Sequence, residues 1–319
     1  MSHIYIYSPS SAQRDKASFR RGVARLKALG HTVEIDPDAL ATHMRFAGDD
    51  ATRLAAIHRA AASGADVAMI SRGGYGLNRL LADINYKAVQ KAIDKGTRFV
   101  GYSDFTAFQC AALAKTGAVT WAGPTVGEDF GVPEQPDDIM EACFDDLLRG
   151  QGEGAGWRLP APRPSAAAPG KPAPATLGMP GARKTVHNAV LWGGNLAVLT
   201  SLLGTPYFPQ VKGGILFLED VAEHPYRVER MLSQLLHAGV LARQKAIVLA
   251  QFTRYQLAPN DKGYKLQTAL DWIRGKLKIP LLANLPFGHV PTKVVLPFGA
   301  SVELLVEGRD ALLYWGQRH

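Results

Sequence analysis

Apolar residues along the first half of the chain alternate between two kinds of spacing. Short apolar runs typical of strands lie at residues 3–8, 31–35, 65–71 and 98–103. Between these runs, apolar residues recur at helical spacing. Because strands that are apolar on both faces need cover on both sides, this order predicts a doubly wound, mostly parallel sheet. We therefore expect residues 1–150 to form an N-terminal α/β domain.

The composition changes near residue 150, which predicts a domain boundary. Residues 151–184 are dense in Pro, Gly and Ala, as is typical of a linker or a long loop. Beyond them, strand-like runs such as 213–221 and 245–252 again alternate with helical patterns. We expect residues 185–319 to form a second, smaller α/β domain, and we expect a site in the cleft between the two domains.

Ser103 occupies the corner where an apolar run stops and a helical pattern begins. A serine in this position is a good helix N-cap, because its hydroxyl accepts a hydrogen bond from a free backbone N–H. It would also be exposed as a nucleophile on a strand-to-helix elbow. The GxSxG form of such an elbow is absent, since Phe105 replaces the second glycine. The corner alone leaves both interpretations open.

A glycine-rich turn follows the third apolar run, in SRGGYGLNRLL at residues 71–81. It fits neither GxGxxG nor GxxxxGK[ST], so the pattern disfavours nucleotide binding. Gly73, Gly74 and Gly76 permit a tight turn with positive φ angles. A turn of this kind would also present backbone N–H groups beside the next strand end, and such donors suit an oxyanion.

A serine nucleophile needs a base, and the base needs an orienting carboxylate. Among nine histidines, His289 differs because it lies past a short apolar run in a loop punctuated by Pro and Gly, although its position alone favours a structural role. Glu219 and Asp220 end another apolar run, so either could face a site or cap a helix. Spacing does not join these residues into one site.

The overall composition restricts the class of function. The 319 residues carry a net charge of +8, with a pI near 9.4, but Lys and Arg are scattered. The excess therefore does not predict nucleic-acid binding, and it would help to attract an acidic small substrate. The first residues resemble neither a signal peptide nor a membrane span, so we expect a cytoplasmic protein. Cys110 and Cys143 lack metal-ligand spacing, which predicts reduced thiols.

Several short motifs resemble those of the LD-carboxypeptidases, also called muramoyltetrapeptide carboxypeptidases. This serine peptidase family includes the microcin C immunity peptidases. The motifs occur in the family's order and extend from the first predicted strand nearly to the last. They are RGGYGLNRLL (72–81), GYSDFTA (101–107), GP (123–124), GGNL (193–196), LFLED (216–220), EHPYRVERML (223–232) and LPFGH (285–289). A Pro- and Ala-rich insertion near 160–180 is longer than expected for the family.

The resemblance implies a role for individual residues. It implies Ser103 as the nucleophile, His289 as the general base and Glu219 as the carboxylate that orients the base. It implies that the backbone N–H groups of Gly74 and Asp104 form the oxyanion hole. Three further residues of the same motifs are expected to bind substrate: Arg72, Tyr75 and Asn195.

The resemblance also implies a reaction. The expected substrate is a murein tetrapeptide, from which the enzyme would release terminal D-alanine by hydrolysing an L,D-amide through an acyl-enzyme, during cytoplasmic peptidoglycan recycling. No metal or organic cofactor is expected, and neither nucleic acid nor membrane is an expected partner. The family often forms homodimers, but the sequence shows no distinct interface.

Two other functions remain open from the sequence. The same catalytic residues would also serve an immunity peptidase that cleaves a peptidyl-nucleotide antibiotic. Two α/β domains that flank a cleft are also typical of non-enzymatic proteins that bind small ligands.

Overall fold

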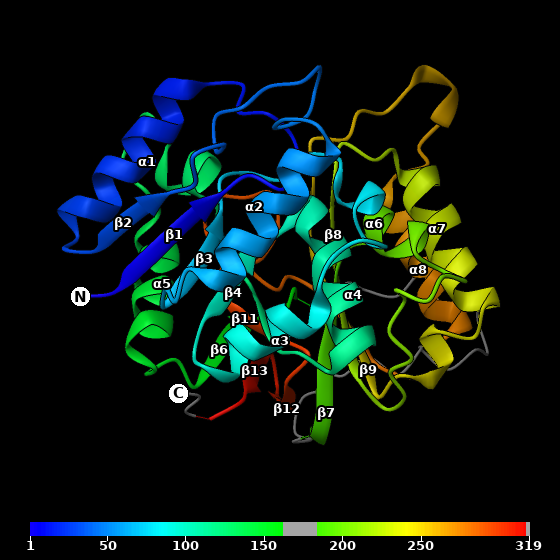
Figure 1. Cartoon of the computed structure of the whole chain (residues 1–319). Helices are drawn as coiled ribbons and strands as arrows, with labels where there is room; N and C mark the ends of the chain where they lie inside the picture. The colour runs from blue at the N-terminus through cyan, green and yellow to red at the C-terminus, as the bar shows by residue number, and fades with distance from the viewer. Residues whose placement is uncertain (162–183, 317–319) are drawn as a thin grey trace, which may run out of the picture.

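Two sheets form the molecule in the computed structural model, which describes residues 1–161 and 184–316 (Figure 1). The first sheet has the strand order β11-β5-β4-β3-β1-β2. Its strands β1 to β5 are mutually parallel, and β11 runs antiparallel to β5. Their bounds are β1 (His3–Tyr7), β2 (Thr32–Ile35), β3 (Val67–Ile70), β4 (Arg98–Gly101), β5 (Thr120–Ala122) and β11 (Leu296–Phe298).

Helices cover both faces of the first sheet, as the apolar runs predict. Alternate residues of one strand point to opposite faces, so Ile4 and Ile6 of β1 pack into one apolar cluster while Tyr5 and Tyr7 pack into another. The first cluster includes residues of α1 (Lys16–Ala28) and α5 (Asp138–Arg149). The second includes residues of α2 (Asp50–Ala62), α3 (Tyr86–Asp94) and α4 (Thr106–Thr116). The prediction of a doubly wound, mostly parallel sheet is confirmed.

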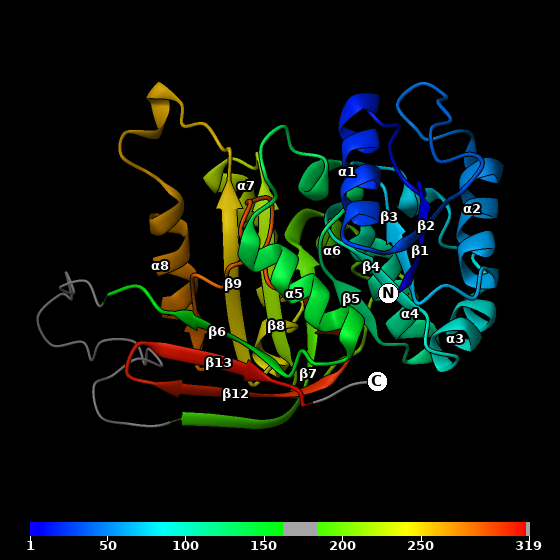
Figure 2. The ribbon, with the colours of Figure 1, turned by 90° about the vertical axis from the view of Figure 1, so that its left-hand side faces the viewer.

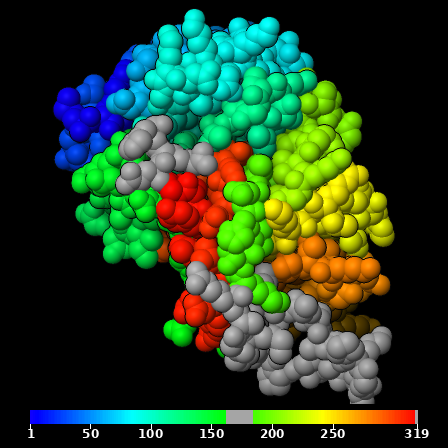
Figure 3. Space-filling model, turned by 90° about the horizontal axis from the view of Figure 1, so that it is seen from below, coloured from blue at the N-terminus to red at the C-terminus, as the bar shows by residue number. Residues whose placement is uncertain are grey.

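The second sheet has the strand order β10-β9-β8-β7-β12-β13-β6 and turns from parallel to antiparallel along its width. Strands β7 to β10 are parallel, and β12, β13 and β6 continue the sheet in antiparallel pairs. In Figure 3 the antiparallel part, with β12, β13 and the green β7, reaches the lower surface. The bounds are β6 (Gly154–Arg158), β7 (Lys184–Asn195), β8 (Ile215–Val221), β9 (Ala246–Thr253), β10 (Leu281–Leu282), β12 (Ser301–Glu307) and β13 (Asp310–Tyr314).

Residues 184–316 contain three α-helices: α6 (Leu196–Ser201), α7 (Pro225–His237) and α8 (Leu266–Lys276). The turn from β7 into α6 lies against α4 of the first half. One apolar cluster therefore runs from Phe108 of α4 through Leu196 to Phe217 of β8. Figure 2 shows the two sheets side by side with α6 between them. This contact fixes the carboxyl ends of β4 and β8 relative to each other.

The expected linker and domain boundaries differ from the structure at two places. Residues 154–158 form β6 and do not belong to a loop, because Ala155 and Trp157 alternate with exposed residues and are buried. The Trp157 Nε1–H also donates to the carbonyl of Ala283 at 3.1 Å. Strand β11 lies in the expected second domain but pairs with β5 in the first sheet. Residues 162–183 of the expected linker lie outside the described residues, and the remaining boundaries stay predictions.

Within residues 1–161 and 184–316, none of the helices has the length and apolar character needed to cross a membrane.

Candidate active site

Ser103 lies at a sharp turn between β4 and a short 3₁₀ turn, Ser103–Phe105, which leads into α4. Its φ is +64°, a left-handed conformation that is uncommon outside glycine and that is often found at functional sites. The side chain is nearly buried, with 8% of the residue exposed. The turn therefore holds the hydroxyl in one direction, as a nucleophile elbow does.

Gly73 allows the glycine-rich turn to approach this elbow. A Cβ atom at Gly73 would lie 2.7 Å from Ser103 Cβ and 2.8 Å from Ser103 Oγ. Real side chains do not approach so closely, so no other residue fits there without moving the serine. The same Cβ position is 3.4 Å from the backbone nitrogen of Asp104. The glycine-rich turn and the Ser103 elbow, which are separate motifs in the sequence, are thus in contact.

His289 connects Ser103 to a buried carboxylate. Its Nε2 lies 3.1 Å from Ser103 Oγ, and its Nδ1 lies 2.8 Å from Glu219 Oε2. Both distances are within hydrogen-bond range for a nucleophile, its base and an orienting group. The structure brings together the three residues that were predicted to form the triad.

The loop that carries His289 is held by aromatic packing. The ring of Phe287 lies 5.5 Å from that of Phe217 in β8 and 6.2 Å from that of Tyr102, the residue before the nucleophile. The Tyr102 ring also packs edge-on against His289, with the ring centroids 5.0 Å apart. These contacts restrict the imidazole to an orientation that suits both of its hydrogen bonds.

Glu219 and Asp220 occupy different environments although they are adjacent. Glu219 is completely buried and faces His289. The Asp220 carboxylate accepts hydrogen bonds from the backbone N–H groups of Val221 and Ala197 at 2.8 and 2.9 Å. Burial, together with the charge of Glu219, raises the pKa of Asp220 to about 7. The geometry favours Glu219 as the partner of the imidazole.

Burial and the neighbouring Glu219 act in opposite directions on the pKa of His289. Burial alone lowers the pKa of the imidazole, because it disfavours the charged form. The nearby Glu219 carboxylate opposes this effect and accepts a hydrogen bond, so the net result is a raised pKa for His289. An ion pair of this kind stabilises the imidazolium that a general base forms when it takes a proton.

Asn195 lies behind the two carboxylates. Its Nδ2 donates to Glu219 Oε1 and to Asp220 Oδ1, both at 3.1 Å. Its backbone N–H donates to Thr106 Oγ1 at 3.0 Å, which ties β7 to α4. The side chain therefore holds Glu219, whereas the resemblance implied that it binds substrate.

The predicted oxyanion hole lies between the elbow and the glycine-rich turn. Gly74 has a φ of +107°, and a Cβ atom there would lie 2.3 Å from Ser11 Oγ, so a side chain would be strained and would clash. The Asp104 carboxylate accepts hydrogen bonds from Ser10 Oγ at 2.6 Å and from the Leu77 N–H at 3.0 Å. These bonds fix the backbones of the two segments relative to each other.

The two other predicted substrate-binding residues, Arg72 and Tyr75, belong to the glycine-rich turn. Arg72 is buried, donates to the carbonyl of Ala12 at 3.1 Å, and pairs with Glu128 at 3.3 Å. Tyr75 is 44% exposed, and its ring lies 6.2 Å from that of Phe46. Neither residue lines the pocket described next.

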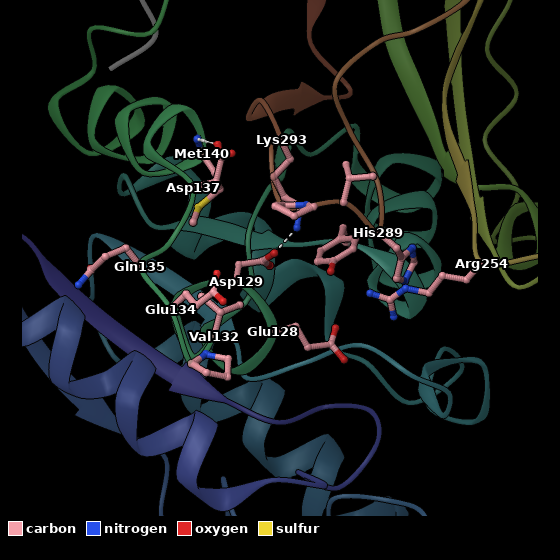
Figure 4. A pocket seen from close by; sticks show the side chains of 14 residues that line it. Glu128, Asp129, Val132, Glu134, Gln135, Asp137, Met140, Arg254, His289 and Lys293 are labelled. Carbon is pink, nitrogen blue, oxygen red and sulfur yellow. Dashed lines mark hydrogen bonds and ion pairs between the residues drawn. The ribbon is translucent and has the colours of Figure 1, made fainter.

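A pocket of about 510 Å³ opens beside His289 (Figure 4). Its lining carries charges of both signs on segments from both halves of the chain. The lining residues are Tyr102, Glu128, Asp129, Val132, Pro133, Glu134, Gln135, Asp137, Met140, Arg254, His289, Val290, Pro291 and Lys293.

Lys293 also lines this pocket, although no sequence motif marks it. This lysine is buried, forms an ion pair with Asp129, and lies with its ammonium nitrogen 4.5 Å from the centre of the Tyr102 ring. Through Tyr102 it belongs to the packing around His289. A single lysine four residues after a histidine forms no recognised motif, so only its position in the fold reveals this contact.

The described parts of the chain contain no group of three or more His, Cys, Asp or Glu side chains arranged to hold a metal ion.

Comparison with known proteins identifies related sequences and structures. Residues 4–123 match the N-terminal domain of LD-carboxypeptidases, and residues 188–304 match their C-terminal domain. A probable murein peptide carboxypeptidase of Bacillus subtilis is 28% identical over 292 residues, covering 91% of this chain and 85% of the relative. The microcin C7 self-immunity protein MccF of Escherichia coli is 28% identical over 253 residues, covering 76% and 72%.

Solved structures show the same fold. The crystal structure of a muramoyltetrapeptide carboxypeptidase from Oxalobacter formigenes has a TM-score of 0.83 and 35% identity, covering 98% of each chain.

Among sequence relatives, a putative carboxypeptidase of Synechocystis is 30% identical over 305 residues, which cover 94% of this chain and 90% of the relative. The chain therefore belongs to the LD-carboxypeptidase family and is a carboxypeptidase of that family.

Proposed function

We propose that Ser103, His289 and Glu219 form a catalytic triad that releases the terminal D-alanine of murein tetrapeptides. The observation that carries this proposal is the continuous hydrogen-bonded path from Ser103 Oγ through His289 to Glu219, with steps of 3.1 and 2.8 Å. The names of the related murein peptide and muramoyltetrapeptide carboxypeptidases support the substrate class.

The first half of the proposed reaction forms an acyl-enzyme. His289 Nε2 accepts the proton of Ser103 as the serine oxygen attacks the carbonyl carbon of the L,D-amide. The oxyanion of the tetrahedral intermediate accepts hydrogen bonds from the backbone N–H groups of Gly74 and Asp104. His289 then donates its proton to the departing nitrogen, the C–N bond breaks, and D-alanine leaves.

The second half restores the enzyme. A water molecule gives a proton to His289 and attacks the ester carbonyl, and the same two N–H groups stabilise the second oxyanion. The ester bond breaks, Ser103 regains its proton from His289, and the shortened peptide leaves as a free acid. Throughout both halves Glu219 keeps Nδ1 of the imidazole protonated and oriented. We place this reaction in cytoplasmic peptidoglycan recycling.

The test is release of D-alanine from a purified murein tetrapeptide. We expect one D-alanine per peptide, with the tripeptide as the other product. A purified, folded protein that leaves the tetrapeptide intact would contradict the proposed substrate. Labelling of Ser103 by a fluorophosphonate in the same sample separates an active serine with another substrate from an inactive protein.

The similarity to the microcin self-immunity protein supports a second candidate function. The same triad would then cleave a peptidyl-nucleotide antibiotic. Equal amounts of enzyme incubated with the tetrapeptide and with an aminoacyl sulfamoyl nucleoside distinguish the two candidates, because the higher kcat/KM identifies the preferred class of substrate. The expected homodimer stays a prediction.

A further inference from the structure

Among the described residues that line the pocket beside His289, one positively charged side chain is paired with a carboxylate and another is not. Two residues with permanent positive charge line it, Lys293 and Arg254. The Lys293 ammonium is buried and is neutralised by Asp129. Arg254 lies at the exposed rim, and no carboxylate of the described residues forms an ion pair with its guanidinium. Arg254 is therefore the cation of this pocket that remains available to a ligand.

The backbone that carries Arg254 is fixed relative to the triad. Arg254 follows directly after β9 and has a φ of +57°, a conformation that costs free energy for a residue with a side chain. The preceding residue, Thr253, donates from Oγ1 to the carbonyl of His289 at 3.4 Å. The Thr253 carbonyl also accepts a hydrogen bond from the Ala222 N–H, beyond the end of β8, at 2.8 Å. The hydrogen bonds of Thr253 thus hold the backbones of Arg254 and His289 close to each other.

The Arg254 side chain extends from this point into the pocket. In Figure 4 the Arg254 side chain extends from the right toward His289, and Glu128 lies on the opposite side. Glu134 and Asp137 also line the pocket, and their carboxylates would repel an anionic ligand, whereas Glu128 is paired with Arg72 at 3.3 Å. An anion entering next to His289 is therefore favoured only where the guanidinium can contact it.

A carboxypeptidase must distinguish the last residue of a peptide from an internal one, and the difference is a free α-carboxylate in place of an amide. Arginine binds carboxylates through charge-assisted and often paired hydrogen bonds. We infer that Arg254 binds the free α-carboxylate of the D-amino acid that leaves, and thereby restricts cleavage to the end of the peptide. This inference rests on the proposed carboxypeptidase reaction at Ser103.

The experiment compares two substrates and two main enzymes. The substrates are a murein tetrapeptide that ends in D-alanine and the same peptide that ends in D-alaninamide. For the wild type we expect a higher kcat/KM with the free acid. Arg254→Gln should lower kcat/KM for the acid by roughly 10- to 100-fold, the loss typical of a hydrogen bond to a charged group. The same substitution should leave kcat/KM for the amide within about twofold, since the amide lacks the charge that Arg254 recognises.

Two variants serve as controls. Arg254→Lys keeps the positive charge and should restore part of the preference for the acid. Lys262→Gln removes the same charge from the same loop, at another exposed residue with a left-handed φ of +47°, but outside the pocket lining. It should leave both substrates unaffected. Melting curves of all variants test whether folding is preserved.

The possible results separate this inference from the proposed function. A wild type that cleaves neither peptide contradicts the proposed reaction, and the inference falls with it. A wild type that cleaves both peptides equally well overturns the inference alone. An Arg254→Gln variant that keeps the preference for the acid, or that loses activity equally on both substrates, also overturns it.

Discussion

At the scale of single residues, the function depends on which of two adjacent carboxylates faces the histidine. Glu219 lies 2.8 Å from His289 Nδ1, whereas Asp220 is occupied by backbone N–H groups and by Asn195. Successive residues of a strand point to opposite faces, so one carboxylate of the pair is expected to reach the imidazole. The resemblance to the family selected Glu219, and the observed geometry agrees with that selection.

We therefore predict that Glu219→Gln lowers kcat by about 10⁴, as expected when the orienting carboxylate of a triad is neutralised. The amide can no longer stabilise the imidazolium that forms during attack. Asp220→Asn is the matched control, since it makes the same change one residue away, and its effect on kcat should be much smaller. Steady-state kinetics of D-alanine release measure both. A larger loss from Asp220→Asn would reverse the assignment.

The raised pKa of His289 leads to a prediction about pH. The general base must be neutral, so kcat/KM should fall as the pH drops through the pKa of His289 in the free enzyme. Glu219 raises that pKa by favouring the imidazolium. Replacing Glu219 by Gln removes this effect and leaves burial, which lowers the pKa. The acidic limb of the kcat/KM profile of Glu219→Gln should therefore lie at lower pH than that of the wild type. A limb that stays in place would show that another group controls it.

At the scale of secondary structure elements, most of the architecture could be predicted from hydrophobic spacing. The parallel strands of the first sheet and the helices between them follow from alternation of strand and helix patterns. Strand β6 was missed because GAGWR contains only two apolar side chains, Ala155 and Trp157, within a stretch dominated by Gly, Pro and Ala. The pairing of β11 with β5 could not be predicted, because spacing within a strand does not specify a partner about 175 residues away.

The site was less predictable than the elements. Ser103 and His289 are separated by 186 residues, so their contact depends on the packing of one sheet against the other. The sequence pattern indicated a serine at a strand-to-helix corner, a histidine in a loop and two candidate carboxylates. Only the resemblance to the family predicted that these residues form one catalytic site. Lys293 and Arg254 have no sequence signal of their own. Their position beside His289 becomes visible only when the loops after β9 and β10 are seen in the fold.

The glycine-rich turn gives a prediction at this scale. Gly73→Ala would place a methyl group 2.7 Å from Ser103 Cβ, so the turn and the elbow must move apart. Moving the turn also displaces the Gly74 N–H, and loss of one oxyanion donor lowers kcat by about 10²–10³. Gly275→Ala in α8 is the control, because its Cβ would have no neighbour within 4 Å. Turnover per site titrated with a fluorophosphonate measures the effect. Normal turnover in Gly73→Ala would remove the turn from the mechanism.

At the scale of the whole molecule, one apolar cluster extends through both halves of the chain and reaches as far as β6. Trp157 in β6 and Phe108 in α4 belong to the same cluster. The two halves are therefore expected to stabilise each other, and the site between them depends on both.

We predict that Trp157→Ala lowers the free energy of unfolding by about 3–5 kcal/mol, the usual cost of removing a buried aromatic side chain. Leu312→Ala in the neighbouring strand β13 is the control, since Leu312 is 39% exposed and should cost much less. Denaturant titration followed by intrinsic fluorescence and by circular dichroism measures both. A cost for Trp157→Ala no larger than that for Leu312→Ala would mean that residues 154–158 act as a linker after all.

The most direct test of the account is the activity of Ser103→Ala on a purified murein tetrapeptide. The substitution removes the oxygen that attacks the amide, and a nucleophile that acts together with its base contributes a factor on the order of 10⁶ to kcat. We predict that the variant melts near the temperature of the wild type, is not labelled by a fluorophosphonate, and releases no D-alanine above the background rate. A folded Ser103→Ala protein that keeps even about a tenth of the wild-type rate would contradict the assignment of Ser103 as the nucleophile.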